Sequence, residues 1–284
     1  MKKIKIITSV IVLNFLSSFA QNEELDHSKI FKKCQITYSD GRITNGYIAF
    51  FLEPKQFDRE DLIASSVEKI LNLDDNNFEF KESISANTKN MSQKDLSSIK
   101  IIFENGNTKT YQLMTVKSLT KEGTVIDSSK KAWLPVVKQD YISLYQINIY
   151  NNISDDIKKK NQFKHLRRLA TITYLASQDE AFEIYNFNQS KFFTSSFGNA
   201  YLGKVLQYLF KDCPTFLDKI IKEGKWDYSP YKNSTIDYDS QIKSVKKSNA
   251  TDEEKYYLID DIYIKQTAEP FIKLIEDYKT NCKK

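Results

Sequence analysis

The chain has 284 residues, of which 13% are aromatic and only seven are glycine, so collagen-like and glycine-rich linker architectures are excluded. It contains 42 basic and 37 acidic residues, but three of the basic ones lie within the first five positions. Without that terminal segment 39 basic and 37 acidic residues remain, a net charge of +2. This balance does not indicate nucleic-acid binding.

Residues 1–20 have the three parts of an export signal peptide. A positively charged start is followed by an apolar stretch over residues 6–16 and by small residues before the predicted cleavage site, Ala20–Gln21. A membrane anchor is the alternative, but about eleven apolar residues are too few to span roughly 30 Å of hydrocarbon. No cysteine stands at the cleavage site, so a lipid anchor is not predicted there. We expect a periplasmic or secreted protein without a transmembrane segment, beginning with a flexible arm over residues 21–30.

The first part of the mature chain has the pattern of β-hairpins. Runs of β-forming residues flank Asp40-Gly41 and Asn105-Gly106, dipeptides that favour a tight primed turn with positive φ at both central positions. Further strand pairs are expected over residues 116–126, 133–150 and 171–187, turning at residues 122–123, 138–140 and 177–179. Between the first two hairpins the sequence predicts a helix over 58–71, a short strand over 78–80 and a polar loop over 83–94, and it predicts a polar connection over 151–168.

Helical periodicity begins after Phe197. A broad apolar stripe over residues 201–210 predicts a helix that ends before Pro214, and Thr215–Asp218 resembles a capping box for a second helix that Gly224 would end. A long loop is expected over 225–250, then a helix from the capping box at Thr251 to about residue 264, and a final helix with Pro270 in its first turn. The predicted fold class is α+β, with a β-rich portion over 31–190 packed against a helical portion over 191–284.

Three cysteines in an exported chain leave one unpaired. Cys213 and Cys282 each follow an apolar helical stretch, so the sequence favours a disulfide between them over two buried free thiols. Cys34, at the start of a predicted strand, is expected to be a small buried apolar residue.

Five short motifs follow one another along the mature chain. They are ITYSDGRITNGYI, YISLYQI, TYLASQDEAFEIY, YLFKDCP and IEDYKTNC. Their order resembles a loose group of exported proteins of unknown function in Bacteroidetes, and the resemblance covers most of the mature chain. It implies an envelope protein with a β-rich first part and a helical, disulfide-bearing tail, and it implies no activity.

Motifs for catalysis, metal binding or nucleotide binding are absent from the sequence. Only His27 and His165 are present, so a zinc site of the HExxH type is excluded, and no GxSxG, GxxxxGK[ST], GxGxxG, CxxC or EF-hand pattern occurs. We therefore assign no catalytic residue, no metal ligand and no cofactor from the sequence.

A basic cluster near the middle of the chain is a possible anion-binding site. Its members are Lys158, Lys159, Lys160, Lys164, Arg167 and Arg168. They could hold a phosphate-bearing head group or an acidic polymer through charge-assisted hydrogen bonds. A solvated connection between strands is the favoured alternative, because charged loops need no ligand.

Two further sets of residues are weaker candidates for catalytic groups. Glu253, Glu254, Asp260 and Asp261 could supply paired carboxylates for glycoside hydrolysis. An exposed acidic helix face is favoured instead, because neighbouring residues on a helix point in different directions. A thiol–imidazole pair of Cys34 and His165 would need direct hydrogen-bond contact, which nothing in the sequence predicts.

The function favoured by the sequence is a non-enzymatic binding or interaction role in the cell envelope. Its expected partner is an envelope protein or an acidic polymer. The alternatives are a hydrolase acting on envelope glycans or peptides, and a structural envelope component. A pocket with convergent acids of perturbed pKa would favour a hydrolase, and an aromatic patch or exposed sheet edge would favour interaction.

Overall fold

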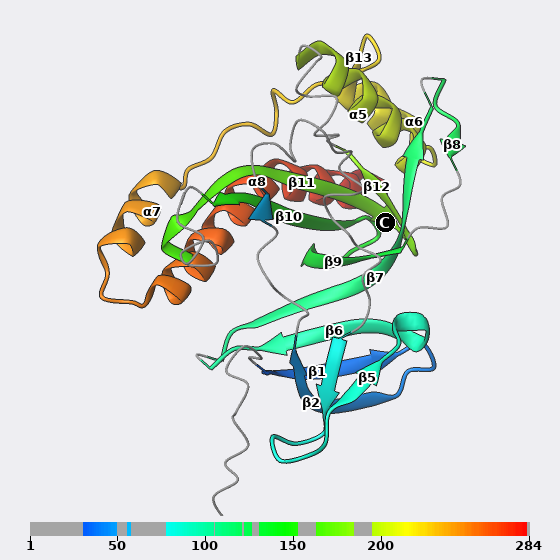
Figure 1. The fold of residues 1–284 in the computed structure, drawn as a ribbon. Helices are drawn as coiled ribbons and strands as arrows, with labels where there is room; N and C mark the ends of the chain where they lie inside the picture. Colours follow the sequence, from blue (N-terminus) through cyan, green and yellow to red (C-terminus); the bar gives the residue numbers. More distant parts are fainter. Residues whose placement is uncertain are drawn as a thin grey trace, which may run out of the picture.

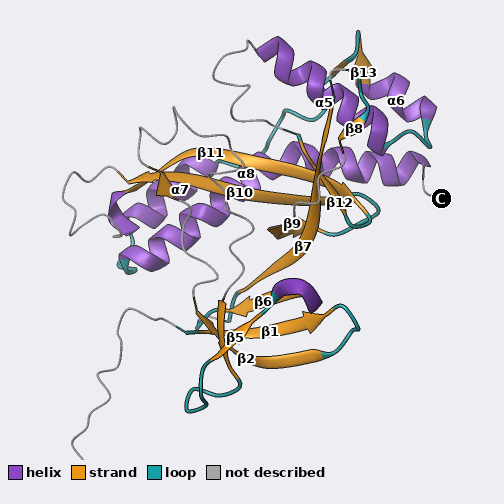
Figure 2. Cartoon of the chain, turned by 45° about the vertical axis from the view of Figure 1, so that its right-hand side comes forward, coloured by secondary structure: helices purple, strands orange, loops and turns teal. Residues whose placement is uncertain are grey.

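The computed structural model describes residues 31–49, 56–57, 78–104, 106–120, 122–126, 131–152, 163–184 and 195–282. The predicted signal peptide, the cleavage site at Ala20–Gln21, the flexible arm and the helix over 58–71 lie outside these residues. The fold is α+β, as the sequence predicted, with a β-rich first part followed by a helical part (Figures 1 and 2).

The strands are β1 (Lys32–Tyr38), β2 (Ile43–Ala49), β3 (Gln56–Phe57), β4 (Phe78–Lys81), β5 (Lys89–Met91), β6 (Leu96–Ile102), β7 (Thr108–Leu119), β8 (Val125–Ile126), β9 (Lys131–Lys138), β10 (Ser143–Asn152), β11 (Leu166–Ser177), β12 (Glu180–Glu183), β13 (Ile221–Lys222) and β14 (Lys225–Trp226). The helices are the 3-10 turns η1 (Gln93–Asp95) and η3 (Phe163–His165), and α5 (Ser195–Leu209), α6 (Pro214–Ile220), α7 (Tyr238–Lys247) and α8 (Asp252–Cys282).

A small antiparallel sheet forms the N-terminal lobe, in the strand order β7-β6-β1-β2-β4-β5 (Figure 1, bottom). Alternate residues of these strands point inward, which is the period that one buried sheet face requires. They enclose a core of Cys34, Ile36, Ile48, Phe78, Phe80, Leu96, Ile99, Ile101, Tyr111 and Trp133. The loop predicted over 83–94 is partly wrong, because β5 and η1 form within it.

The hairpin turn at Asp40-Gly41 differs from the predicted primed type. The backbone N–H of Gly41 donates to the carbonyl of Tyr38 at 3.0 Å, and Gly41 alone takes a left-handed φ of +85°, while Asp40 does not. Gly106 and Gly123 also have left-handed φ values, +82° and +92°, and their N–H groups donate to the carbonyls of Phe103 and Thr120. The turn at Gly41 therefore needs positive φ at only one residue, as in a type I turn followed by a left-handed glycine.

Strand β7 belongs to two groups of strands. Its first half pairs with β6 of the N-terminal lobe, and its second half begins a ring in the order β7-β9-β10-β11-β12, which closes where β12 pairs parallel with β7. Inside the ring lie Met114, Ala132, Leu134, Tyr145, Ile149, Ile172, Tyr174, Ala176 and Ala181. Because one continuous strand serves both groups, the position of each group depends on the other.

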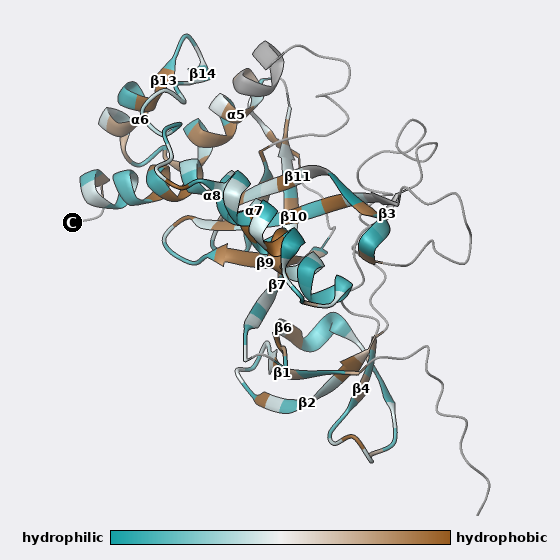
Figure 3. Cartoon of the chain, turned by 90° about the vertical axis from the view of Figure 1, so that its left-hand side faces the viewer, coloured by the Kyte–Doolittle hydropathy of each residue, from teal (hydrophilic) through white to brown (hydrophobic). Residues whose placement is uncertain are grey.

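The helices cover the outer face of β10, β11 and β12. One cluster joins strand residues such as Leu175 and Phe182 to Leu206 and Phe210 of α5 and Leu274 of α8. Gly203 of α5 packs so closely on the β13–β14 turn that a Cβ there would overlap the backbone of Gly224. Figure 3 shows apolar segments along β9 and β10 and largely polar residues on α7.

The structure corrects three predictions in the helical part. Thr215–Asp218 is not a capping box, because α6 begins directly at Pro214 with Cys213 as its N-cap and no side-chain cap. Gly224 does not end a helix but forms the β13–β14 turn. The loop predicted over 225–250 contains β14 and α7.

Helix α8 is continuous through Pro270, where the sequence predicted a break and a new helix. The capping box at Thr251 is confirmed, since Thr251 N–H donates to Glu254 Oε2 at 2.7 Å and Glu254 N–H donates to Thr251 Oγ1 at 3.2 Å. A proline inside a helix costs about 3 kcal/mol. Burial along the whole helix offsets this cost, with Ile262, Ala268, Leu274, Ile275 and Tyr278 all in the core.

The disulfide predicted between Cys213 and Cys282 is present, with a Cα–Cα distance of 5.9 Å. It joins the start of α6 to the last residue of α8. Beside it, Phe210, Phe216 and Tyr278 pack ring against ring with centroids 4.5–5.5 Å apart. Within the described residues, no helix is long and apolar enough to cross a membrane.

We predict that replacing both disulfide cysteines with serine lowers the free energy of unfolding by about 4 kcal/mol, because the crosslink restricts a loop of 69 residues in the unfolded chain. Urea unfolding of the purified protein measures this change. As a control, reductant should destabilise the native protein but not the Cys213→Ser/Cys282→Ser variant. Equal unfolding midpoints for the native protein with and without reductant would contradict the prediction.

Candidate binding site

The structure describes only part of the predicted basic cluster. Lys158, Lys159 and Lys160 lie outside the described residues. Lys164 of η3 and Arg167 of β11 are exposed, whereas Arg168 is part of the fold. Its guanidinium lies 4.1 Å from the centre of the Tyr263 ring and donates to Thr171 Oγ1 at 2.8 Å. Anion binding by this cluster stays a prediction, and Arg168 already has partners in α8 and β11.

Cys34 is buried, as the sequence predicted. Its side chain has no exposed surface, and burial raises the pKa of its thiol to about 12. A nucleophilic cysteine needs the opposite shift, because the thiolate is the reactive form. Cys34 lies in the core of the N-terminal lobe, whereas His165 lies in η3, which packs against α8.

The prediction of an exposed acidic helix face is wrong for Asp260, which is buried. Its side chain is only 8% exposed, and its carboxylate accepts hydrogen bonds from Tyr150 Oη (2.6 Å) and Asn148 Nδ2 (2.9 Å). Lys109 Nζ lies 3.1 Å from the other carboxylate oxygen. Asp261, the next residue, is 59% exposed and pairs with Lys265 on the surface. The two neighbouring acids therefore have opposite environments.

The groups around Asp260 titrate far from neutral pH. Burial, followed by the charge of Asp260, raises the pKa of Tyr150 well above its ordinary value. Burial raises the pKa of Tyr111 to about 12, even though Lys109 acts against this. Burial alone would lower the pKa of Lys109, but Tyr111 and Asp260 raise it above its ordinary value. The tyrosines stay neutral and the lysine charged at physiological pH, so this network joins α8 to β7 and β10 rather than exchanging protons.

We predict that Asp260→Asn lowers the free energy of unfolding by about 2–3 kcal/mol, because it removes one charge of a buried, hydrogen-bonded pair. The partly exposed Lys109 limits the loss. Chemical denaturation measures the change.

Asp261→Asn is the matched control for this substitution, and it should change the free energy by less than about 0.5 kcal/mol. A similar effect of the two substitutions would show that the buried network adds no stability.

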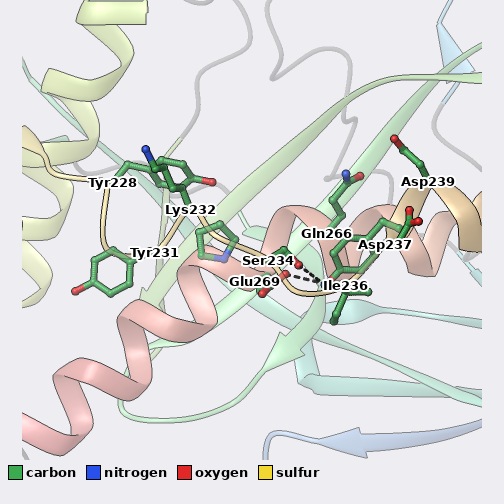
Figure 4. A pocket seen from close by; sticks show the side chains of 11 residues that line it. Tyr228, Tyr231, Lys232, Ser234, Ile236, Asp237, Asp239, Gln266 and Glu269 are labelled. Carbon is green, nitrogen blue, oxygen red and sulfur yellow. Dashed lines mark hydrogen bonds between the residues drawn. The ribbon is translucent and has the colours of Figure 1, made fainter.

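A pocket lies between α8 and the irregular segment that leads into α7 (Figure 4). Its volume is about 320 Å³, within the range of small-molecule sites. The lining combines three tyrosines, three carboxylates and a few other groups: Tyr228, Tyr231, Lys232, Ser234, Ile236, Asp237, Tyr238, Asp239, Gln266, Glu269 and Pro270. It is a concave site in which several polar side chains lie close together.

Residues 228–238 form the outer wall of the pocket, and α8 holds them in place through one helical stripe. Tyr231 Oη donates to Asp277 Oδ2 at 2.7 Å, and Lys273 Nζ donates to the carbonyl of Asn233 at 2.6 Å. Residues 266, 269, 270, 273 and 277 follow the spacing of one helix face. The wall therefore depends on α8 being continuous through Pro270.

Glu269 is the central polar group of the pocket. It accepts a hydrogen bond from Tyr238 Oη at 3.1 Å and lies 2.7 Å from Lys273 Nζ, and Figure 4 shows Ser234 beside it. Hydrogen bonds from Lys273 and Ser234 hold the pKa of Glu269 below its ordinary range. Hydrogen bonds from Ser240 lower the pKa of Asp237 in the same way. Both carboxyl groups are therefore ionised at neutral pH.

An aromatic group supports one end of the pocket. The buried ring of Trp226 stacks on Phe271 of α8 and on Tyr231, with centroid distances of 5.2 and 6.0 Å. Tyr228 packs edge-on against Trp226 at 5.1 Å, yet 42% of its surface is exposed. Ile236 on the rim is 46% exposed. Two large apolar side chains thus remain open to solvent at the mouth of a polar pocket.

The described residues include no group of three or more His, Cys, Asp or Glu side chains that could hold a metal ion. Comparison of the chain with protein-family models, with curated proteins and with solved structures finds no match. The pocket must therefore be interpreted from its own chemistry.

Sequence reasoning missed this pocket, because residues 225–250 lack a strong apolar period and were interpreted as a loop. One signal was present. Five tyrosines lie between residues 228 and 257 among polar residues: Tyr228, Tyr231, Tyr238, Tyr256 and Tyr257. Three of them line the pocket. Pairing them with Glu269 required the fold.

We predict that residues 232–238 detach from α8 in acid before the core unfolds. A lowered pKa means that ionised Glu269 stabilises the attachment. This stabilisation is complete above the ordinary carboxyl pKa of about 4.3 and is lost as the pH falls through the lower pKa of the folded state. Hydrogen exchange of these amides measures the loss.

The control is the Glu269→Gln variant, with exchange rates corrected for the intrinsic pH dependence of exchange. Its amides at residues 232–238 should exchange faster than those of the native protein at neutral pH. The acid-dependent increase seen in the native protein should be absent. A corrected profile identical to that of the native protein would show that Glu269 does not hold the segment.

Proposed function

We propose that this chain is an exported, non-enzymatic binding protein, and that its pocket between α8 and residues 228–238 holds a protruding group of an envelope partner. The observation that carries the proposal is the combination of a solvent-exposed Tyr228–Ile236 rim with ionised, hydrogen-bonded carboxylates below it. Exposed apolar side chains around a polar pocket are typical of recognition sites. Export and envelope location follow from the signal-like residues 1–20 and from the resemblance of the motifs.

The pocket supports binding better than glycoside hydrolysis. A glycosidase needs one carboxylic acid with a raised pKa to protonate the leaving group. Glu269 and Asp237 both have lowered pKa values, and both carboxylates already accept hydrogen bonds that position structural elements. Asp237 caps α7, and Glu269 anchors Tyr238. These are the properties of fixed charges rather than of a proton donor.

We expect a photo-crosslinking amino acid at position 236 to capture one recurrent partner in native cells. Ile236 is 46% exposed on the pocket rim, so a replacement there should contact a bound partner without disturbing the core. Mass spectrometry of the adducts identifies the partner and the captured residue.

Ile84 provides the control position, because it is 72% exposed in the N-terminal lobe and lies outside the pocket. The same crosslinker at position 84 should not capture this partner with similar yield. No adduct from position 236, or equal capture from both positions, would overturn the proposed function and redirect work to hydrolase substrates.

A further inference from the structure

The chemistry of the pocket also indicates which kind of group it accepts. We infer that it binds an ammonium or guanidinium group, carried as a lysine or arginine side chain by the partner polypeptide. This inference rests on the proposed function and specifies the ligand of the same pocket. It follows from charge, hydrogen-bond capacity and the apolar rim.

The fixed charge of the lining is negative. Asp237, Asp239 and Glu269 face one lining lysine, Lys232, whose ammonium points away from Glu269 in Figure 4. Lys273 balances Glu269, and the charge of Lys243 acts on Asp237. The carboxylate of Asp239 has no ion pair or hydrogen bond with any of the residues described here. This unpaired carboxylate attracts a cation and repels phosphates and carboxylates.

The hydrogen-bonding groups of the pocket are also rich in acceptors. Besides the carboxylates, the backbone next to Pro270 supplies an acceptor, because proline lacks an N–H group. In an uninterrupted helix the carbonyl oxygen of Gln266 would accept the N–H of residue 270, and proline has none. Gln266 and Pro270 both line the pocket. Ammonium and guanidinium groups carry only donors, so they match such a lining.

The rim suits the rest of a lysine or arginine side chain. These side chains have an apolar stem of three or four methylene groups behind the charged head. Tyr228 and Ile236 offer apolar surface at the mouth of the pocket, and an aromatic ring attracts a cation on its face. A volume of about 320 Å³ can accommodate one such side chain.

The test compares N-acetyl-arginine amide with N-acetyl-citrulline amide, which has nearly the same shape and no charge. Both are titrated into the purified protein, with NMR signals of labelled tyrosines as the readout. We expect the arginine compound to shift the Tyr228 and Tyr238 signals with a millimolar or lower Kd, and the citrulline compound to bind at least tenfold more weakly. N-acetyl-lysine amide and N-acetyl-norleucine amide form a second matched pair.

Asp239→Asn should weaken binding of the arginine compound about three- to tenfold and leave citrulline unchanged. Asp261→Asn, which removes another exposed charge outside the pocket lining, should have no effect. Added salt should weaken binding of the native protein and affect Asp239→Asn less.

The outcomes separate the two proposals. Equal affinity for the charged and neutral compounds would overturn the cation inference while supporting a binding pocket. Binding of neither charged compound, together with a partner captured from position 236, would also overturn the inference and leave the proposed function standing. No ligand shifts and no capture would overturn both.

Discussion

The buried contact of Asp260 with Lys109, Asn148 and Tyr150 is the interaction on which the rest of the molecule depends. It fixes the first half of α8 against β7 and β10, and β7 is the strand shared by the N-terminal lobe and the ring. Around it, Tyr256 packs on Tyr150 and Phe163, and Lys32 of β1 donates to Tyr257. One helix thus contacts β1, β7 and β10.

The far end of α8 is fixed by covalent and aromatic contacts instead. The disulfide at Cys282, the Tyr278 ring among Phe210 and Phe216, and the Tyr278 Oη bond to Asp212 (2.7 Å) hold the last turns to α5 and α6. A 31-residue helix anchored at both ends tolerates Pro270 in its middle, because local helix propensity no longer decides whether the helix continues. The pocket lies beside this proline.

The sequence predicted the features that depend on neighbouring residues. The hairpins around Gly41 and Gly106 and the capping box at Thr251 follow from local spacing, whereas the pairing of Cys213 with Cys282, 69 residues apart, followed from the cysteine count and from the apolar helical stretch before each of the two. The failures concern residues whose role depends on distant partners. Asp260 lies in an acidic, helix-forming stretch that is indistinguishable locally from an exposed face, and its partners are more than 100 residues away. From its local preference, Pro270 was predicted to begin a new helix. Tertiary burial instead keeps α8 continuous through it.

The contacts that hold the pocket together also bear on its proposed binding role. Several hydrogen bonds that position residues 228–238 use a carboxylate, such as those of Asp277 with Tyr231 and of Glu269 with Tyr238, so groups that build the pocket also carry its charge. Glu269 cannot both anchor Tyr238 as an anion and supply a proton at neutral pH, since the contacts that lower its pKa are the ones that form the wall. A ligand that brings donors and positive charge adds to this arrangement without disrupting it. An anionic ligand would compete with the carboxylates for Lys273 and loosen the wall that encloses it.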